Sequence, residues 1–235
     1  MKFDLYGDEI GAVEYVSHMG SDLSVVNAAR VSFGSTREEL NEKDLKLINY
    51  LMQHNHTSPF EHCAITMRFT VPLFIRSQHH RHRTWAYNEI SRRYTSVDMQ
   101  FYEPEEFRTQ HKSNRQASED NLVNPLVTFK DSYNTGHSGY AASMVKRHHA
   151  TSMEVYQSLL DAGVCREQAR GVLPQNLYTQ YYGTANLHNL LKFISLRSHD
   201  GAQWEIQRVA QACLAIAKEY FPEAIKAYEK KYMEL

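Results

Sequence analysis

The chain has 235 residues, of which 42% are hydrophobic and 23% charged, and its formal net charge is −1, which is the composition of an ordinary globular protein. Its apolar runs are short and broken by charges, which excludes a membrane span, and the acidic start MKFDLYGDEI lacks the apolar core of a secretory signal. The length predicts one domain over residues 1–235, with two small domains as the alternative. Three cysteines at wide, unpatterned spacing indicate a reducing compartment, so we expect a cytoplasmic protein.

The first 55 residues predict one strand and two helices. Gly11 to Met19 alternates apolar and polar residues as a strand does. Ser21 or Asp22 is placed to cap a helix through LSVVNAARV, and Asn41 is placed to cap the next helix, DLKLINYLMQH.

The stretch HTSPFEH, residues 56–62, predicts a rigid turn because Pro59 pushes Ser58 out of the helical region. Cys63 to Pro72 then alternates as a strand. The following residues, 71–85, predict a helix on which Gln78 and Arg81 lie one turn apart and can meet one ligand.

The middle of the chain is the least regular part. Residues 103–121 are polar and lack periodicity, which predicts a surface loop or lid. A helical pattern returns from about Asn121 and is clearest from Ala141 to Ala162, with Gly163 at its end.

The last third predicts elements in close succession. These are a short helix in Cys165–Pro174, a strand in Leu177–Ala185, a helix LHNLLKFISLR capped by Asn186, a long amphipathic helix from Gln203 to Tyr220, and a final helix from Pro222.

One stretch, Gln78 to Tyr94, holds several charged and imidazole side chains close together in the sequence. From Arg76 to Arg93 the sequence has five arginines and three histidines against one acid, Glu89. Arginine grips a phosphate with two parallel hydrogen bonds and stays charged when it is partly buried. The stretch therefore favours a compact anionic ligand, although a solvated helix face has the same composition.

Two other functions fit parts of this stretch. His79, His80 and His82 could bind zinc in a hydrolase, but cationic neighbours oppose a dication and no Cys or Asp completes the set. The interleaved arginines and aromatic residues could bind nucleic acid, but the net charge near zero and the lack of a second basic stripe oppose this. Neither a Gly-rich phosphate loop nor an evidently activated cysteine is present.

Five motifs in order along the chain resemble those of the flavin-dependent thymidylate synthases. The most specific is RHR followed by NExSxRY, here Arg81 to Arg83 and Asn88 to Tyr94. The others are AARVSF, HTSPFEH, RGVLP and NLHNLLKFISLR with AQWEIQ, so the resemblance covers nearly the whole chain.

This resemblance implies a single catalytic domain of mixed α/β (α+β) class, with a twisted, largely antiparallel sheet flanked by helices. It also implies a homotetramer with active sites at subunit interfaces, without nucleic-acid or membrane partners. The implied reaction converts dUMP to dTMP with FAD as cofactor, methylenetetrahydrofolate as one-carbon donor and NADPH as reductant, and uses no nucleophilic cysteine and no metal.

The resemblance also implies two sets of site residues. Those expected to contact dUMP are Gln78, His79, His80, Arg81, Glu89, Ile90, Ser91, Arg92, Arg93, Arg170 and Arg197. Those expected to contact FAD are Ser58, Arg81, His82, Arg83, Glu89, Asn186, Leu187, His188 and Lys192.

Arg197 is the implied catalytic residue. Because a guanidinium does not act as a base, Arg197 would favour the ionised uracil imide electrostatically. The sequence departs from the commonest family pattern at Ala86, Ser58, Lys192 and Gly201. A histidine contact is therefore not expected at position 201, and the flavin contact of Lys192 is the least typical.

Overall fold

The computed structural model describes residues 1–233, and the chain forms two compact units. Unit 1 comprises Met1–Val71, Ile75–Glu89 and Gln180–Leu235. Unit 2 comprises Pro72–Phe74 and Ile90–Thr179. The expected single catalytic domain over the whole chain stays a prediction.

Unit 1 is organised around a five-stranded sheet in the order β1-β2-β3-β9-β4. The pairs β1–β2, β2–β3 and β4–β9 are antiparallel. In β3 the buried residues Ile65, Met67 and Phe69 alternate with partly exposed ones, because successive side chains of a strand face opposite sides. The strands are β1 (Lys2–Asp4), β2 (Ala12–Met19), β3 (Ala64–Pro72), β4 (Ala86–Glu89) and β9 (Tyr178–Asn186).

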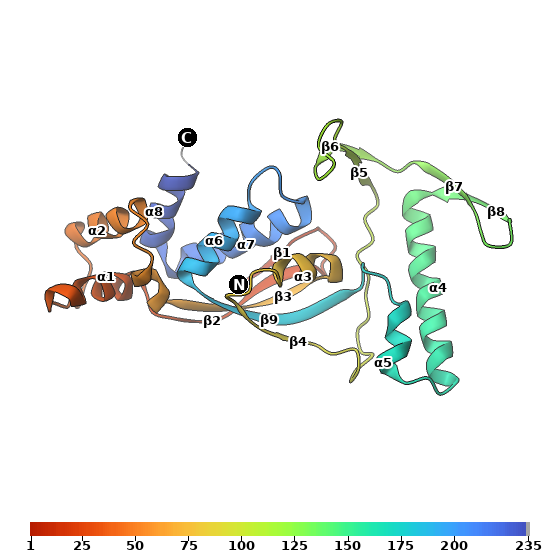
Figure 1. Cartoon of the computed structure of the whole chain (residues 1–235), viewed down its shortest axis with the longest axis horizontal. Coiled ribbons are helices and arrows are strands. Elements are labelled where there is room, and N and C mark those ends of the chain that lie inside the picture. Colours follow the sequence, from red (N-terminus) through yellow and green to blue (C-terminus); the bar gives the residue numbers. More distant parts are fainter. Residues whose placement is uncertain (234–235) are drawn as a thin grey trace. The chain divides into compact units, whose positions relative to one another are not determined.

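Helices α6 and α7 lie side by side over one face of this sheet (Figure 1). The α7 side chains Ile206, Val209 and Cys213 are fully buried, as their helical spacing predicts. The helices with residues in unit 1 are α1 (Asp22–Arg30), α2 (Glu42–Gln53), α3 (Leu73–His79), α6 (Leu187–Arg197), α7 (Trp204–Tyr220) and α8 (Pro222–Tyr232), with short 3-10 turns η1 (Val31–Phe33) and η2 (Ser58–His62).

The predicted helix caps are confirmed. The side-chain oxygen of Asn41 accepts hydrogen bonds from the amides of Lys43 and Asp44 at 2.9 and 3.3 Å, and Asn186 accepts from Asn189 at 2.9 Å. Each cap begins its helix within two residues of the predicted start.

The helix predicted for residues 71–85 was too long. Helix α3 ends at His79, and the chain then reverses into β4, which pairs with β9. The Tyr87 hydroxyl donates toward the carbonyls of His79 and His82 at 2.9 and 3.1 Å, which satisfies acceptors at the helix end. Gln78 and Arg81 therefore do not lie on two successive turns of one helix.

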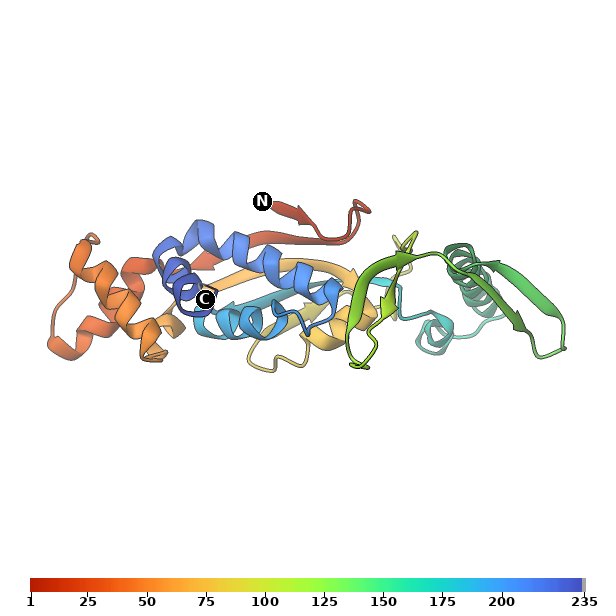
Figure 2. The ribbon, with the colours of Figure 1, turned by 90° about the horizontal axis from the view of Figure 1, so that it is seen from above.

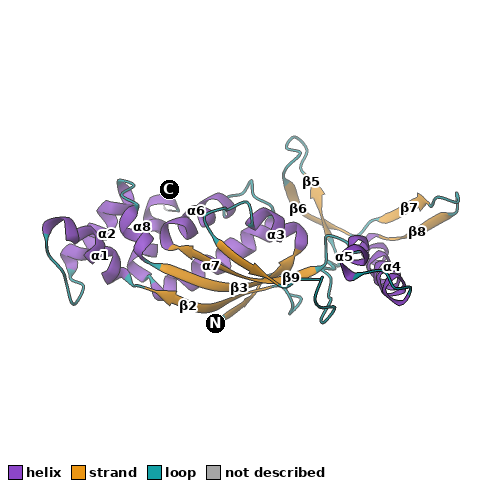
Figure 3. Cartoon of the chain, turned by 60° about the horizontal axis from the view of Figure 1, so that its bottom comes forward, coloured by secondary structure: helices purple, strands orange, loops and turns teal. Residues whose placement is uncertain are grey.

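Unit 2 contains two separate antiparallel ribbons, β5–β6 and β7–β8 (Figure 3). Helix α4 packs beside β7 and β8 (Figure 2). The elements are β5 (Phe107–Gln110), β6 (Ser118–Val123), β7 (Leu126–Lys130), β8 (Gly136–Tyr140), α4 (Ala141–Asp161), α5 (Arg166–Ala169) and the 3-10 turn η3 (Arg170–Val172).

Two expectations about this middle segment were wrong in secondary structure. Residues 103–121 hold β5 and the start of β6 instead of an irregular loop, and the helix begins at Ala141, not near residue 121. Pro125 lacks a backbone donor, and Asp131 accepts from the amides of Tyr133 and Thr135 at 2.9 Å each, which closes a hairpin. A role for the segment as a lid stays a prediction.

The fold class is confirmed as mixed α/β, with antiparallel sheets flanked by helices. Within residues 1–233, no helix combines the length and apolar character needed to cross a membrane.

Candidate active site

Arg197, the last residue of α6, is held in unit 1 by two neutral acceptors. Its Nε donates to Nε2 of His82 at 3.2 Å, and its Nη2 lies 3.5 Å from the Gln78 carbonyl oxygen. Because His82 accepts at Nε2, its ring is neutral and carries its proton on Nδ1. The other guanidinium nitrogen is left for a ligand.

The charges around Arg197 are all of one sign. Burial first, and then the positive charge of Arg81, lower the pKa of Arg197. Burial and the charges of Arg197 and Lys192 lower the pKa of His82 to about 4, so His82 is neutral near pH 7. No carboxylate among the described residues 1–233 pairs with Arg197. This corner of unit 1 is therefore electropositive without internal compensation.

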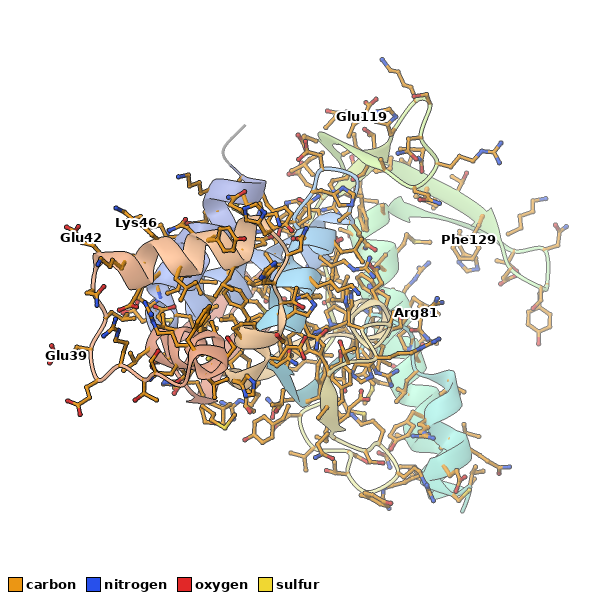
Figure 4. All side chains as sticks on the ribbon, turned by 60° about the vertical axis from the view of Figure 1, so that its left-hand side comes forward. Glu39, Glu42, Lys46, Arg81, Glu119 and Phe129 are labelled. Atoms are coloured by element: carbon orange, nitrogen blue, oxygen red, sulfur yellow. The ribbon has the colours of Figure 1, made fainter. Side chains whose placement is uncertain are left out.

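Arg81 and Arg83 add exposed guanidinium groups to the loop after α3. The Arg81 side chain is shown in Figure 4. Lying outside the helix, these side chains reach solvent and can meet an anionic ligand.

His79 belongs to the core of unit 1. Its side chain is fully buried, its Nδ1 lies 2.8 Å from the Tyr181 hydroxyl, and its ring contacts those of Trp85 and Phe193. Burial is the main reason why the pKa of His79 is well below its usual value. The expected contact of His79 with dUMP therefore has no exposed imidazole to support it.

Two expected site residues, Glu89 at the end of β4 and His80 just after α3, each have a partner in unit 1. Arg76 donates to Glu89 through a 3.0 Å contact, and the ring of His80 stacks on that of Tyr87 with centroids 4.1 Å apart. Burial, opposed by Glu89 and assisted by Arg76, lowers the pKa of His80. The His80 Nε2 atom is buried and has no partner among residues 1–233, so a ligand could satisfy it.

Five expected flavin contacts lie in or next to η2 and α6 of unit 1. His188 and Lys192 line an apolar cavity of about 210 Å³, together with residues of α2, η2 and α8. Asn186 is partly exposed, whereas Leu187 is fully buried and its amide donates to the Cys63 carbonyl at 2.8 Å. Leu187 is thus a core residue, and the exposed Ser58 begins η2.

Unit 2 brings together two arginines that are distant in sequence. Arg93 lies 3.6 Å from the Glu167 carboxylate, and Arg170 donates from its Nε to the Glu167 carbonyl at 3.3 Å. The hydroxyl oxygen of Ser91 accepts from the Arg93 amide at 3.3 Å. In this cluster, which we call the Glu167 cluster, Arg93 faces the carboxylate of Glu167 and Arg170 is held by the main-chain carbonyl of the same residue.

The other two expected dUMP contacts in unit 2 differ from these. Arg92 is tied to the carbonyls of Val97 and Tyr178 at 2.7 and 3.4 Å, which gives it a structural role. Ile90 is 37% exposed and is therefore available for contact.

The cysteines offer poor nucleophiles. Burial and the charge of Asp22 raise the pKa of Cys63 to about 11, and burial raises the pKa of Cys213 further. Cys165 is exposed, with its sulfur 3.8 Å from the Gln168 side-chain oxygen. No set of three or more His, Cys, Asp or Glu side chains in the described part of the chain is arranged to hold a metal ion.

Comparison with known proteins places this site in a family. The family model described as "Thymidylate synthase complementing protein" matches residues 14–223. A flavin-dependent thymidylate synthase of Thermus thermophilus is 42% identical over 224 residues, which is 95% of this chain and 77% of that protein. The chain belongs to the flavin-dependent thymidylate synthase family.

Other members of the flavin-dependent thymidylate synthase family and a solved relative agree. The enzyme of Thermotoga neapolitana is 40% identical over 220 residues, 94% of this chain and 91% of that protein. The crystal structure of a UMP/dUMP methylase, PolB from Streptomyces cacaoi bound with 5-Br dUMP, has a TM-score of 0.78 and 33% identity and covers 98% of both chains. The resemblance seen in the sequence motifs is therefore confirmed.

Three residues of this family member were not predicted as site residues. Gln203 accepts a hydrogen bond from the Gln78 side chain at 2.6 Å and donates one to Glu205 at 2.9 Å. Glu167 contacts both Arg93 and Arg170 in unit 2. AQWEIQ was recognised as a motif, but the sequence alone does not show which of its side chains turn toward Gln78.

Proposed function

We propose that this protein is a thymidylate synthase that converts dUMP to dTMP, with FAD as cofactor, methylenetetrahydrofolate as one-carbon donor and NADPH as reductant. The observation that supports this most is the environment of Arg197. Its guanidinium is partly buried, faces only neutral acceptors and lies near a second cation, Arg81. Such a group stabilises an anion that develops beside it.

The anion that suits Arg197 is an ionised uracil imide. Ionisation at N3 delocalises negative charge over the ring and raises the electron density at C5, the carbon that receives the one-carbon unit. Neutral His82 fixes the plane of the guanidinium by accepting from its Nε. We infer that Arg197 acts by charge and orientation, since a guanidinium does not take up the imide proton.

The phosphate of dUMP requires cations, because a phosphate monoester carries about two negative charges near neutral pH. We propose Arg93 and Arg170 for this role. Both are exposed and both contact Glu167, Arg93 at its carboxylate and Arg170 at its main-chain carbonyl. A phosphate can replace the carboxylate as the partner of Arg93. Gln78, Arg81 and the segment from Glu89 to Ser91 are proposed to complete the nucleotide contacts.

The residues near α6 fit a flavin. The cavity of about 210 Å³ is lined in equal parts by apolar or aromatic residues and by polar residues, and His188 and the exposed Lys192 are among the polar ones. This combination suits a planar ring system attached to phosphates. Ser58, Arg81, Arg83, His82, Glu89 and Asn186 are proposed as further contacts. The bound flavin would supply the hydride chemistry, and the protein residues would bind and orient it.

The remaining parts of the proposal rest on family resemblance. We propose a homotetramer with active sites at subunit interfaces, without nucleic-acid or membrane partners. Cytoplasmic location agrees with three free cysteines in the described chain, two of them buried.

One experiment tests the proposed function directly. The purified protein is incubated with FAD, dUMP, methylenetetrahydrofolate and NADPH without oxygen, and dTMP is measured together with the flavin spectrum. We expect a yellow protein whose colour bleaches with NADPH and which forms dTMP only when all components are present. A parallel reaction with UMP tests the ribonucleotide. A protein that binds no flavin and forms no dTMP would contradict the proposal, and metal analysis and oligonucleotide binding would then test the zinc hydrolase and nucleic-acid alternatives.

A further inference from the structure

Three side chains form a continuous hydrogen-bonded series that ends at Gln78. Glu205 lies in the first turn of α7 and is 4% exposed. Its Oε2 accepts from the Gln203 Nε2 at 2.9 Å, and the Gln203 Oε1 accepts from the Gln78 Nε2 at 2.6 Å. We call Glu205, Gln203 and Gln78 the amide relay.

The chemistry of these groups fixes the direction of the series. An ionised carboxylate only accepts hydrogen bonds, so the side of the Gln203 amide that faces Glu205 must be the NH2 group. The Gln203 carbonyl then faces Gln78, which must present its own NH2 group to it. Without a carboxylate at the end, both glutamine amides could rotate by about 180° and still form two hydrogen bonds.

The relay ends in the candidate active site. The Gln78 carbonyl oxygen of the main chain lies 3.5 Å from the Arg197 Nη2, and Gln78 is only partly buried. With one amide hydrogen held by Gln203, the Gln78 side chain retains one N–H and its carbonyl oxygen in fixed positions. None of the described residues 1–233 occupies these two groups.

We propose that Glu205 and Gln203 are positioning residues, which hold the Gln78 amide in one orientation for recognition of the bound nucleotide monophosphate. This inference rests on the proposed function for the identity of the ligand. The position of Glu205 in the first turn of α7 is consistent with the role, since acidic side chains are favoured at a helix N-terminus.

The test uses Glu205→Gln, Gln78→Ala and the double variant, with the dissociation constant of dUMP measured by calorimetry on the flavin-loaded protein. Glu205→Gln keeps the side-chain size but adds a donor, so both amides can rotate. We expect about tenfold weaker dUMP binding and a similar rise in KM, with kcat changed less than threefold and flavin content unchanged. In the Gln78→Ala background, Glu205→Gln should have no further effect on dUMP affinity.

A merely structural role of Glu205 gives a different result. Loss of folding stability would weaken binding by the same factor with or without the Gln78 side chain, and that outcome would overturn the proposal. Unchanged dUMP affinity in Glu205→Gln would also overturn it. If Glu205→Gln does not fold, Gln203→Met breaks the relay at its middle and is measured in the same two backgrounds.

Two controls separate this inference from the proposed function. Gln211→Ala changes an exposed glutamine of the same helix that contacts Arg208, and it should leave dUMP affinity unchanged. Wild-type protein that neither binds dUMP nor forms dTMP would refute the proposed function. Wild-type protein that binds dUMP but shows additive effects in the double variant would refute the relay alone.

Discussion

The two arginine groups of this protein differ in what neutralises them. In unit 1, Arg197 contacts a neutral imidazole and a carbonyl, and its pKa is lowered by burial and by the charge of another arginine. In unit 2, Arg93 faces the Glu167 carboxylate, and Arg170 donates to the main-chain carbonyl of Glu167. An uncompensated guanidinium suits a weak anion that forms during a reaction, whereas an arginine that already holds a carboxylate, as Arg93 does, suits exchange for a strong, permanent anion.

The comparison predicts that Arg197→Ala has the largest effect. Removing a preorganised group that stabilises developing charge costs about 10²–10³ in kcat. We expect a loss of this size in dTMP formation, while flavin content and the thermal unfolding midpoint change little. Arg208→Ala, which removes an exposed arginine on α7, is the matched control and should keep full activity. If Arg197→Ala lowers kcat by less than about threefold, Arg197 does not stabilise developing charge, and the two arginine groups do not differ in this respect.

Arg93→Ala and Arg170→Ala should act on binding instead of turnover. A charge-assisted hydrogen bond contributes about 1.5–3 kcal/mol, so each variant should raise the KM for dUMP by about 10–100-fold with kcat nearly unchanged. Arg166→Ala, which changes an exposed arginine of the short helix α5 just before Arg170, is the control. A fall in kcat at saturating dUMP would show that unit 2 arginines take part in the chemical step.

The neutrality of His82 can be tested through pH. The pKa of His82 in the folded protein is about 4, below its usual value near 6.5, so the unfolded chain binds the additional proton between these two values. The neutral His82 side chain therefore leaves the free energy of unfolding at its full value above pH 6.5, and this free energy decreases as the pH falls toward 4. His82→Asn keeps an acceptor but does not titrate, so its unfolding midpoint should fall a few °C less than that of wild type between pH 7.5 and 5.

The control for this measurement is His148→Asn, which replaces an exposed histidine of α4 and should follow the wild-type curve. Parallel curves for wild type and His82→Asn would mean that His82 is not kept neutral by its surroundings.

The smallest effect should come from Glu167→Gln. The Arg93–Glu167 pair is exposed, with side-chain accessibilities of 49% and 62%, so it contributes at most about 1 kcal/mol. Removing the acid releases Arg93 for the phosphate, and dUMP should bind about two- to fivefold more tightly. Glu154→Gln on α4, which changes an exposed acid of the same unit, is the control. Weaker dUMP binding in Glu167→Gln would show that the carboxylate orients the arginines more than it competes for them.

Local signals in the sequence predicted much of the fold. The caps at Asn41 and Asn186, the alternating strand before Pro72 and the apolar stripe of α7 depend on neighbours in sequence, and the structure has all of them. The end of α3 at His79 depends on Tyr87 and on the pairing of β4 with β9, which are contacts between distant segments. The spacing of apolar residues within one segment does not predict contacts between distant segments.

In the candidate active site, too, the sequence predicted some features and missed those that depend on contacts between distant segments. The sequence motifs identified the segments that form the candidate site, but they did not show which of their side chains are exposed to a ligand. His79 and Leu187 are buried in the core, although both were expected to contact ligands. Glu205 had no predicted role because a single acid in a helical motif gives no sign of the two amides that it orients.

The most direct test of the account is the preference for an acidic imide. A fluorine at C5 of the uracil ring lowers the pKa of the imide, so 5-fluoro-dUMP ionises more readily than dUMP. If Arg197 stabilises the anion, wild-type protein should bind 5-fluoro-dUMP more tightly than dUMP while dUMP is mostly neutral. This ratio should fall toward one as the pH rises far enough to ionise both ligands, and Arg197→Ala should bind both equally. An equal ratio of the two affinities in wild type and Arg197→Ala would show that Arg197 does not stabilise the imide anion.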